Sequence, residues 1–236
     1  MPIDARVIRR AANLFVVITS CSASKDDSVP IPPDSRIVEP SYYLDDQILI
    51  SRLHETRESI FEDPRAHTGE KITYAFDLYV RTGKAYTGLL KNNYYRLKEK
   101  LLRRNDIEWF FLSGGYGIIH AIEKAREYQA TFNRSIAYQK GIPYTTDLWN
   151  SVLASICDAI FSKFRSEWVY VFGSKDYTRF VKKTDYWKRS NNIKMFESTG
   201  SAGPYWLSPI LDDLVNSIFD NRVDDFNVKY GKFVKQ

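Results

Sequence analysis

Four short polar segments, each placed after a run of hydrophobic residues, carry the side chains of this sequence that are best suited to bind a ligand. They are SCSASK (residues 20–25), SGGYG (113–117), GSKDY (173–177) and STGSAG (198–203). Glycine lets a ligand approach the backbone closely, and serine hydroxyls both donate and accept hydrogen bonds. Lys25 and Lys175 each follow a predicted strand by a few residues, so both can place a cation beside a phosphate. For any one segment, an ordinary tight turn is the alternative.

A histidine and two carboxylates follow the glycine-rich segment. If residues 118–130 are helical, His120, Glu123 and Glu127 lie on one face, where a histidine and a carboxylate can act as an acid/base pair. The alternative is a solvated helical face that happens to contain a histidine. Cys21 can act as a nucleophile because a nearby ammonium group favours the thiolate, and a small buried cysteine is the alternative.

Other kinds of site are not predicted. No stretch fits the phosphate-binding pattern G-x-x-x-x-G-K-[ST], and SGGYGIIHA does not complete the dinucleotide-binding pattern G-x-G-x-x-G. The three histidines lack the spacing of zinc ligands, and two cysteines are too few for a cysteine-rich metal site. We therefore expect no metal and no cofactor.

The hydrophobic pattern indicates which elements position these segments. Buried strands are predicted over residues 14–19, 109–112, 168–172 and 193–198, and helices over 44–62, 91–104, 145–164, 177–187 and 206–220. Residues 118–130 are interpreted as a loop or a short helix. Strands separated by helices predict a single α/β domain with a mainly parallel central sheet flanked by helices. In such sheets ligands bind beyond the carboxyl ends of the strands, so the four polar loops are expected to form one pocket.

Charge and aromatic content slightly favour a polyanionic partner. The 236 residues carry a formal net charge of +5, and 15% of them are aromatic. Basic and aromatic residues alternate in the segment 175–194, where lysine can neutralise phosphates while tyrosine or tryptophan stacks on an unpaired base. Amphipathic helices with lysines lying over buried rings are the alternative. The residues expected to contact a DNA backbone are Lys175, Arg179, Lys182, Lys183, Lys188 and Arg189.

The cysteine count and the amino-terminal sequence favour a cytoplasmic protein. Cys21 and Cys157 cannot form a disulfide framework, which is typical of a reducing compartment. The apolar run at residues 14–18 is too short for a signal sequence or a membrane span, so no membrane association is expected. We divide the chain into an amino-terminal segment (1–13), an α/β domain (14–220) and a basic carboxyl-terminal tail (221–236).

Two motifs are similar to those of a known family. GKAYTGLL (83–90) followed by LSGGYGIIHAIEKAREYQ (112–129) resembles the YaaA-like proteins, a family named for a bacterial peroxide-stress protein. ITSCSASK (18–25) resembles a related group in which a strand ends in a Cys-Ser-x-Ser-Lys turn. The family often has proline and an acidic residue after its second motif, where this chain has His120-Ala121-Ile122-Glu123.

The resemblance implies an α/β domain that binds DNA and is related to uracil-DNA-glycosylase-like and base-exchange enzymes. The residues that match its motifs are Tyr86, Thr87, Gly88, Ser113, Tyr116, Gly117 and Tyr128, with Cys21, Ser22, Ser24 and Lys25 from the first turn. Together with Gly114, Gly115, Gly173 and Ser174, they are the residues expected at the site.

The leading functional hypothesis is a DNA N-glycosylase that excises a modified or damaged base, with a role in phage defence or repair. Such an enzyme acts on a flipped or single-stranded base and needs a pocket and stacking aromatic groups, for which Tyr86, Tyr116 or Tyr128 is the candidate. The glycines would admit the sugar or phosphate. Glu123 would stabilise the sugar cation, and His120 or Lys25 the departing base. The alternatives are a DNA-binding stress-protection protein without catalysis and a nucleotide- or nucleoside-binding transferase. The number of subunits is left open.

Overall fold

A five-stranded sheet forms the centre of the molecule, and four of its strands are parallel. The computed structural model describes residues 14–103, 106–164, 168–198 and 203–231. The strand order is β4-β3-β1-β6-β7. The parallel strands are β1 (Phe15–Ser20), β3 (Ile107–Ser113), β6 (Trp168–Ser174) and β7 (Ile193–Ser198), and β4 (Gly117–His120) is antiparallel to β3. The predicted α/β class and the mainly parallel sheet are confirmed.

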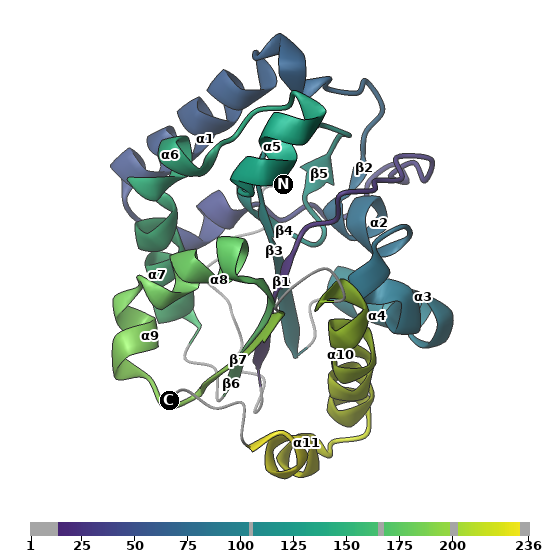
Figure 1. Ribbon diagram of the computed structural model, residues 1–236. Helices are drawn as coiled ribbons and strands as arrows, with labels where there is room; N and C mark the ends of the chain where they lie inside the picture. Colours follow the sequence, from purple (N-terminus) through teal and green to yellow (C-terminus); the bar gives the residue numbers. More distant parts are fainter. Residues whose placement is uncertain (1–13, 104–105, 165–167, 199–202, 232–236) are drawn as a thin grey trace.

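Helices cover both faces of this sheet. In Figure 1, α7, α8 and α9 lie on one side, and α2, α3, α4 and α10 lie on the other. This two-sided cover explains why the central strands are almost continuously hydrophobic in sequence. The helices are α1 (Gln47–Phe61), α2 (Ala75–Val80), α3 (Thr87–Asn92), α4 (Tyr94–Leu102), α5 (Arg134–Lys140), α6 (Thr146–Asn150), α7 (Leu153–Lys163), α8 (Lys175–Lys182), α9 (Asp185–Arg189), α10 (Gly203–Phe219) and α11 (Val223–Lys229). Short 3-10 turns, η1 (Pro40–Tyr43), η2 (Pro64–Ala66) and η3 (Lys84–Tyr86), connect some of them.

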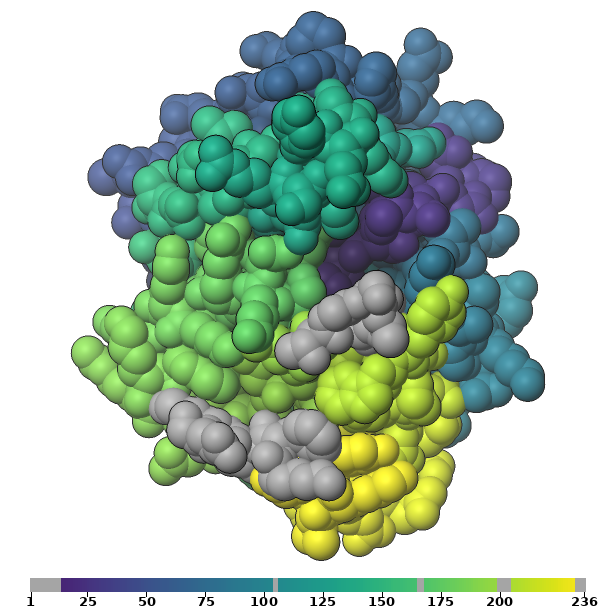
Figure 2. Space-filling view, viewed as in Figure 1, coloured from purple at the N-terminus to yellow at the C-terminus, as the bar shows by residue number. Residues whose placement is uncertain are grey.

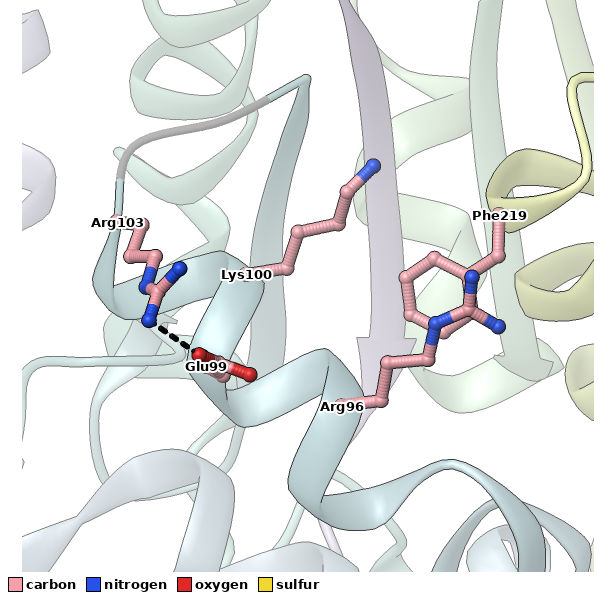
Figure 3. A pocket seen from close by; sticks show the side chains of 5 residues that line it. All are labelled: Arg96, Glu99, Lys100, Arg103 and Phe219. Atoms are coloured by element: carbon pink, nitrogen blue, oxygen red, sulfur yellow. Dashed lines mark ion pairs between the residues drawn. The ribbon is translucent and has the colours of Figure 1, made fainter.

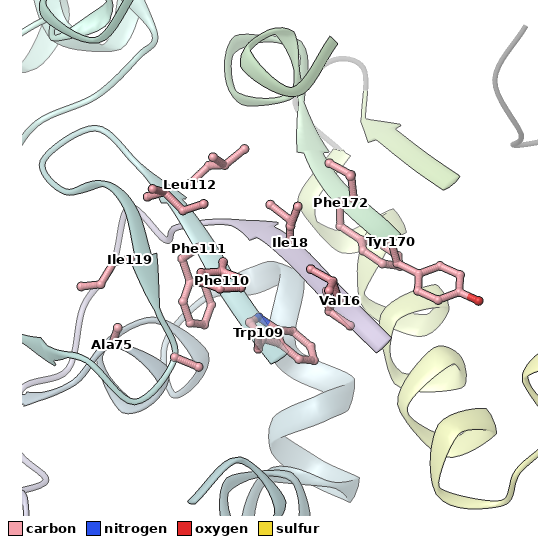
Figure 4. Close-up of a cluster of buried hydrophobic side chains, with 14 of the residues drawn as sticks. Val16, Ile18, Ala75, Trp109, Phe110, Phe111, Leu112, Ile119, Tyr170 and Phe172 are labelled. Atoms are coloured by element: carbon pink, nitrogen blue, oxygen red, sulfur yellow. The ribbon is translucent and has the colours of Figure 1, made fainter. Parts of the chain in front are cut away.

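Large aromatic side chains dominate the core. Figure 4 shows Trp109, Phe110 and Phe111 of β3 beside Val16 and Ile18 of β1, and all five side chains are inaccessible to solvent. The polar edge of Trp109 is satisfied because its indole N–H donates to Thr19 Oγ1 at 3.1 Å. Much of the aromatic content noted in the sequence therefore stabilises the sheet by burial.

The segment after the glycine-rich turn differs from the expected loop or short helix. Residues 117–120 form β4, and Lys124–Ala125 form β5, which pairs with β2 (Thr73–Tyr74) in a small second sheet. In β4 the pairs Phe111–Ile119 and Leu112–Ile118 continue the apolar layer of β3. The hairpin is local, and its apolar residues gain burial against the sheet, so the strand conformation is favoured.

The structure differs in detail from two other predictions. The helix expected over 145–164 is divided into α6 and α7, with Ser151 and Val152 between them. Part of the expected carboxyl-terminal tail folds as α11. The Phe226 ring of α11 packs against Tyr170 and Phe196, with ring centroids 5.7 and 5.9 Å apart. The expected amino-terminal segment 1–13 lies outside the described residues.

The chain itself occupies the space beside the three glycines of the SGGYG segment. A Cβ on Gly114 would lie 2.6 Å from the Ala130 carbonyl oxygen, and one on Gly115 would lie 2.6 Å from the Tyr128 ring. Gly117 has a φ of +69°, and a Cβ there would meet the Trp149 ring at 2.5 Å. These glycines therefore permit close internal packing, in place of the ligand approach predicted from the sequence.

Candidate functional site

Three of the four polar segments meet at one edge of the sheet. Because β3, β1, β6 and β7 are adjacent and parallel, their carboxyl ends lie side by side. The Cys21 N–H donates to the Leu112 carbonyl at 2.7 Å, and a Cβ on Gly173 would lie 3.4 Å from Ser20 Cβ. The segments after residues 20, 113 and 174 therefore share one edge of the sheet, and the pocket expected there stays a prediction. Residues 199–202 of the fourth segment lie outside the described part of the chain.

A buried network of hydroxyl groups lies beneath this edge. The Tyr128 hydroxyl lies 2.6 Å from Ser113 Oγ and 3.1 Å from the Tyr79 hydroxyl, and Ser113 Oγ accepts a hydrogen bond from the Tyr116 N–H. Tyr79, Tyr128 and Ser113 are fully buried. Burial raises the pKa of both tyrosines well above the ordinary value, so both remain protonated. The network is a fixed scaffold for the residues above it.

Lys25 lies over this scaffold. Its Nζ is 4.3 Å from the centroid of the Tyr128 ring, an arrangement in which the ring face attracts an ammonium group. Burial nevertheless lowers the pKa of Lys25, while Cys21 and Glu127 act in the opposite direction and Lys140 reinforces the decrease. At a given pH, a larger fraction of Lys25 is therefore the neutral amine than of a solvated lysine. A neutral amine can act as a nucleophile or a base.

Hydrogen bonds to α2 hold the loop that carries Lys25. The Asp26 N–H donates to the Leu78 carbonyl at 3.1 Å, and the Asp26 carboxylate forms an ion pair with Arg81 at 2.8 Å. Asp26 therefore fixes the residue next to Lys25 in the chain, which limits where the amine can lie.

A thiol and a tyrosine complete the strand-edge site, which we define as Cys21, Lys25, Ser113, Tyr128 and Tyr177. Cys21 Sγ lies 3.7 Å from the Tyr177 hydroxyl, within hydrogen-bonding distance for sulfur, and the thiol is partly exposed. Tyr177 stands at the first turn of α8, two residues after Lys175. Burial raises the pKa of Tyr177 well above its ordinary value, so this hydroxyl remains protonated and can accept a hydrogen bond from the Cys21 thiol.

The structure places two predicted catalytic residues in internal contacts. Glu123 is 4% exposed and forms an ion pair with Arg57 at 2.6 Å, and it also accepts the His120 N–H. Burial raises the pKa of Glu123 to about 7, and Arg57 opposes the increase. His120 is 1% exposed, and its Nε2 lies 2.8 Å from Glu108 Oε2. Glu123 is held by Arg57 of α1 and His120 contacts Glu108 of β3, so the side chains of the two residues are not arranged as an acid/base pair.

The three tyrosines expected to stack on a flipped base are also buried. Tyr86, Tyr116 and Tyr128 are 1%, 6% and 0% exposed, so their ring faces are already covered by protein. The Tyr86 hydroxyl donates to the Ser20 carbonyl, and the Tyr116 hydroxyl accepts the Arg126 N–H at 2.9 Å. Tyr128 belongs to the strand-edge site, Tyr86 and Tyr116 bind nearby backbone, and none of the three forms an exposed stacking surface.

The remaining predicted binding residues line the rim of the sheet edge. Ser22 and Ser174 are partly exposed, Ser24 and Thr87 are exposed, and Gly173 is buried in β6. The Gly88 N–H donates to Ser208 Oγ at 2.9 Å, which attaches α3 to α10.

The predicted DNA-contacting cations lie on α8 and α9, which follow β6 directly from the strand edge. Lys175, Lys182, Lys183, Lys188 and Arg189 are exposed. Lys182 pairs with Glu197 at 2.7 Å, and Lys183 donates to Asn150 at 3.2 Å. Arg179 makes an internal contact instead: its guanidinium donates to Thr146 Oγ1. A basic surface therefore extends from the strand-edge site, with Arg179 holding α8 in place.

A shallow hollow lies at the opposite edge of the sheet. Figure 3 shows its lining residues, and the Arg96 guanidinium carbon stands 4.0 Å from the centroid of the Phe219 ring. Arg103 pairs with Glu99, and Lys100 pairs with Asp106, whose carbonyl accepts the Phe15 N–H at the start of β1. This hollow is therefore remote from the strand-edge site.

Comparisons with protein-family models and with curated proteins found no match to this chain. Within the described ranges, no helix combines the length and apolar character needed to cross a membrane. The same ranges contain no group of three or more His, Cys, Asp or Glu side chains arranged to hold a metal ion.

Sequence reasoning missed Tyr177 of the strand-edge site and the partners of two predicted catalytic residues. Tyr177 belongs to the GSKDY segment and stands three residues after the end of β6, a position that could have identified it. Arg57 and Glu108, which hold Glu123 and His120, have no comparable signal. They lie on α1 and near the start of β3, and only the folded chain brings each to its partner.

Proposed function

We propose that this protein is a DNA N-glycosylase that excises a modified or damaged base, with Lys25 as the catalytic residue. The observation that carries the proposal is the position of Lys25: a partly buried amine with a lowered pKa, held against Tyr128 at the common edge of four parallel strands. Desolvated lysines are effective nucleophiles because more of the neutral amine is present near neutral pH.

The neighbouring basic surface supports DNA as the substrate. Exposed cations on α8 and α9 begin at the edge where Lys25 lies, so a phosphate backbone held along them reaches the site. Contacts of this kind position a strand without reading its sequence.

In the proposed reaction, the neutral amine of Lys25 attacks C1′ of the deoxyribose. The bond between Nζ and C1′ forms as the bond between C1′ and the base nitrogen breaks. The electron pair leaves with the base, which takes a proton from water, and Nζ releases one proton. The sugar ring then opens to an imine, and water hydrolyses this imine, which restores the amine and leaves an abasic site.

Glu127 takes the role that the sequence assigned to Glu123. Its carboxylate interacts electrostatically with Lys25, whereas Glu123 is bound to Arg57. A carboxylate in that position stabilises positive charge on the sugar and accepts the proton that Nζ releases.

Base release from DNA tests the proposal. The wild-type protein is incubated with DNA that carries a panel of modified and damaged bases, and free base and abasic sites are quantified by mass spectrometry. Release by the wild type, loss of release in Lys25→Met and retention in Lys163→Met are expected. Lys163 is the control because it is an exposed lysine at the end of α7, where it pairs with Asp45. Tight, salt-sensitive binding without release across the panel would instead favour a DNA-binding protein without catalysis.

A further inference from the structure

The burial of Tyr86, Tyr116 and Tyr128 leaves the proposed enzyme without the stacking groups expected from the sequence. A glycosylase that holds a base out of the duplex needs aromatic faces exposed near its reactive centre. In this protein, such faces must come from exposed aromatic side chains at the carboxyl edge of the sheet.

The start of α10 lies at this edge. The helix begins at Gly203, five residues after β7 ends at Ser198. The consecutive elements η3 and α3 connect it to the end of β1: Tyr86 of η3 donates to the Ser20 carbonyl, and the Gly88 N–H of α3 donates to Ser208 of α10. The first turns of α10 are therefore linked to the loop that carries Lys25.

Two aromatic side chains in the first turn of α10 are exposed. Tyr205 is 57% exposed and Trp206 is 41% exposed. The Nζ of Lys84 lies 5.3 Å from the centroid of the Tyr205 ring, and Lys84 is itself exposed. In Figure 2 the yellow-green start of α10 stands out from the surface near the purple loop that follows β1. We call Lys84, Tyr205 and Trp206 the α10 rim surface.

We infer that the α10 rim surface binds unpaired nucleotides of the DNA substrate by stacking a base on Tyr205 and Trp206 while Lys84 contacts a phosphate. Aromatic stacking on bases tolerates any sequence, and a lysine beside the ring supplies the charge complementary to the backbone. The inference rests on the proposed function, since it assigns the form of DNA that this enzyme engages: a strand with at least one unpaired base.

Comparing the affinity for DNA with bases and for DNA without bases distinguishes stacking from charge attraction. Binding is measured for a fluorescent oligothymidylate and for an abasic oligonucleotide of equal length, which carries the same phosphates without bases. The wild type is expected to bind the oligothymidylate about tenfold more tightly. Tyr205→Ala should lose this preference, and Tyr205→Phe should retain it because the ring remains.

Tyr42→Ala is the matched control, since Tyr42 is also 57% exposed but lies in η1, next to β4 and away from the strand edge. It should bind both oligonucleotides like the wild type. Lys84→Ala should weaken binding of both oligonucleotides alike and reduce the dependence on salt. Equal affinity of the wild type for the two oligonucleotides would overturn the inference, and so would an unchanged preference in Tyr205→Ala.

The two proposals fail in distinguishable ways. If Lys25-dependent base release occurs but Tyr205→Ala binds like the wild type, the stacking surface is refuted and the glycosylase stands. If the preference for bases depends on Tyr205 but no DNA in the panel releases a base, the stacking surface stands and the glycosylase is refuted. If the oligonucleotides do not bind, whereas an unrelated protein is captured through Tyr205, the surface serves a protein partner and the inference is overturned.

Discussion

At the residue scale, the proposed chemistry depends on the environment of one lysine. The sequence places Lys25 after a strand, but its neighbours come from elsewhere in the chain: Tyr128 beneath it, and Glu127 and Lys140 in its electrostatic field. A lysine in solution stays charged near neutral pH, whereas burial at this edge favours the neutral form. The folded environment therefore distinguishes Lys25 from an exposed lysine.

The lowered pKa of Lys25 predicts an unusual reactivity toward acylating reagents. Only the neutral amine reacts, so Lys25 should reach half of its maximal reaction rate at a pH below 10.5, the ordinary pKa of a lysine side chain. The exposed Lys163 serves as the reference in the same samples. Competitive acetylation over a pH series, with peptides quantified by mass spectrometry, measures this difference. Identical pH profiles for Lys25 and Lys163 would show that burial does not lower the pKa of Lys25.

A second residue-scale prediction concerns Arg57, whose guanidinium donates to Glu123 and to the carbonyls of Tyr116 and Ile118. Arg57→Leu should lower the free energy of unfolding by about 3–5 kcal/mol, because it leaves a buried carboxylate without its cation. Urea denaturation measures the change. Arg65→Leu is the control, since the Arg65–Asp63 pair has the same 2.6 Å separation but is exposed, and it should leave stability nearly unchanged. Equal effects of the two substitutions would contradict a structural role for Arg57.

At the element scale, the strands were predictable and the edge hairpin was not. Each buried strand contains consecutive β-branched or aromatic residues, a pattern that is typical of parallel strands covered on both faces. Residues 117–125 contain only the pair Ile118-Ile119 between a glycine and polar residues. Residues 117–120 and 124–125 adopt strand conformation because β3 and β2 offer them pairing partners. Helix α11 was missed for a similar reason: it is short, and its place depends on Phe226 packing against the sheet.

The glycine-rich turn provides a prediction for the β3–β4 hairpin. Gly117→Ala and Gly141→Ala each place a side chain at positive φ, which costs about 1–2 kcal/mol. Gly117→Ala should cost more, because its Cβ would meet the Trp149 ring, whereas nothing lies within 4 Å of the Cβ position at Gly141. The difference between their unfolding free energies measures the contact with Trp149. A cost at Gly117 no larger than that at Gly141 would show that the turn does not need this close packing.

The basic surface of α8 and α9 is also tested at this scale. Lys183→Ala should weaken binding to DNA and reduce the slope of log affinity against log salt by about 1, because one phosphate contact is lost. Lys163→Ala is the comparison: Lys163 is also exposed but ends α7, where it pairs with Asp45. Fluorescence anisotropy over a salt series gives both slopes. If the two variants lose affinity equally, α8 and α9 contribute only net charge.

At the scale of the whole molecule, parallel topology explains why separated polar segments meet. Once β1, β3 and β6 are parallel neighbours, the loops after residues 20, 113 and 174 must share an edge, and this could be inferred from the order of strands and helices alone. The identity of the side chains that lie at this edge could not be inferred in the same way. Glu123 was chosen for its position after a glycine turn, but Arg57, 66 residues earlier in the chain, binds it. Pairing across such separations is decided by packing and leaves no local pattern.

The most direct test of the account is reductive trapping of Lys25 on DNA. The protein is incubated with DNA carrying the panel of modified and damaged bases in the presence of borohydride, which reduces the imine to a stable bond, and the cross-linked peptide is sequenced by mass spectrometry. We expect a covalent protein–DNA complex whose only attachment is at Lys25, formed by the wild type and by Lys163→Met but absent from Lys25→Arg. Base release by the wild type without any trapped complex, or a complex that persists in Lys25→Arg, would contradict the assignment of Lys25 as the nucleophile.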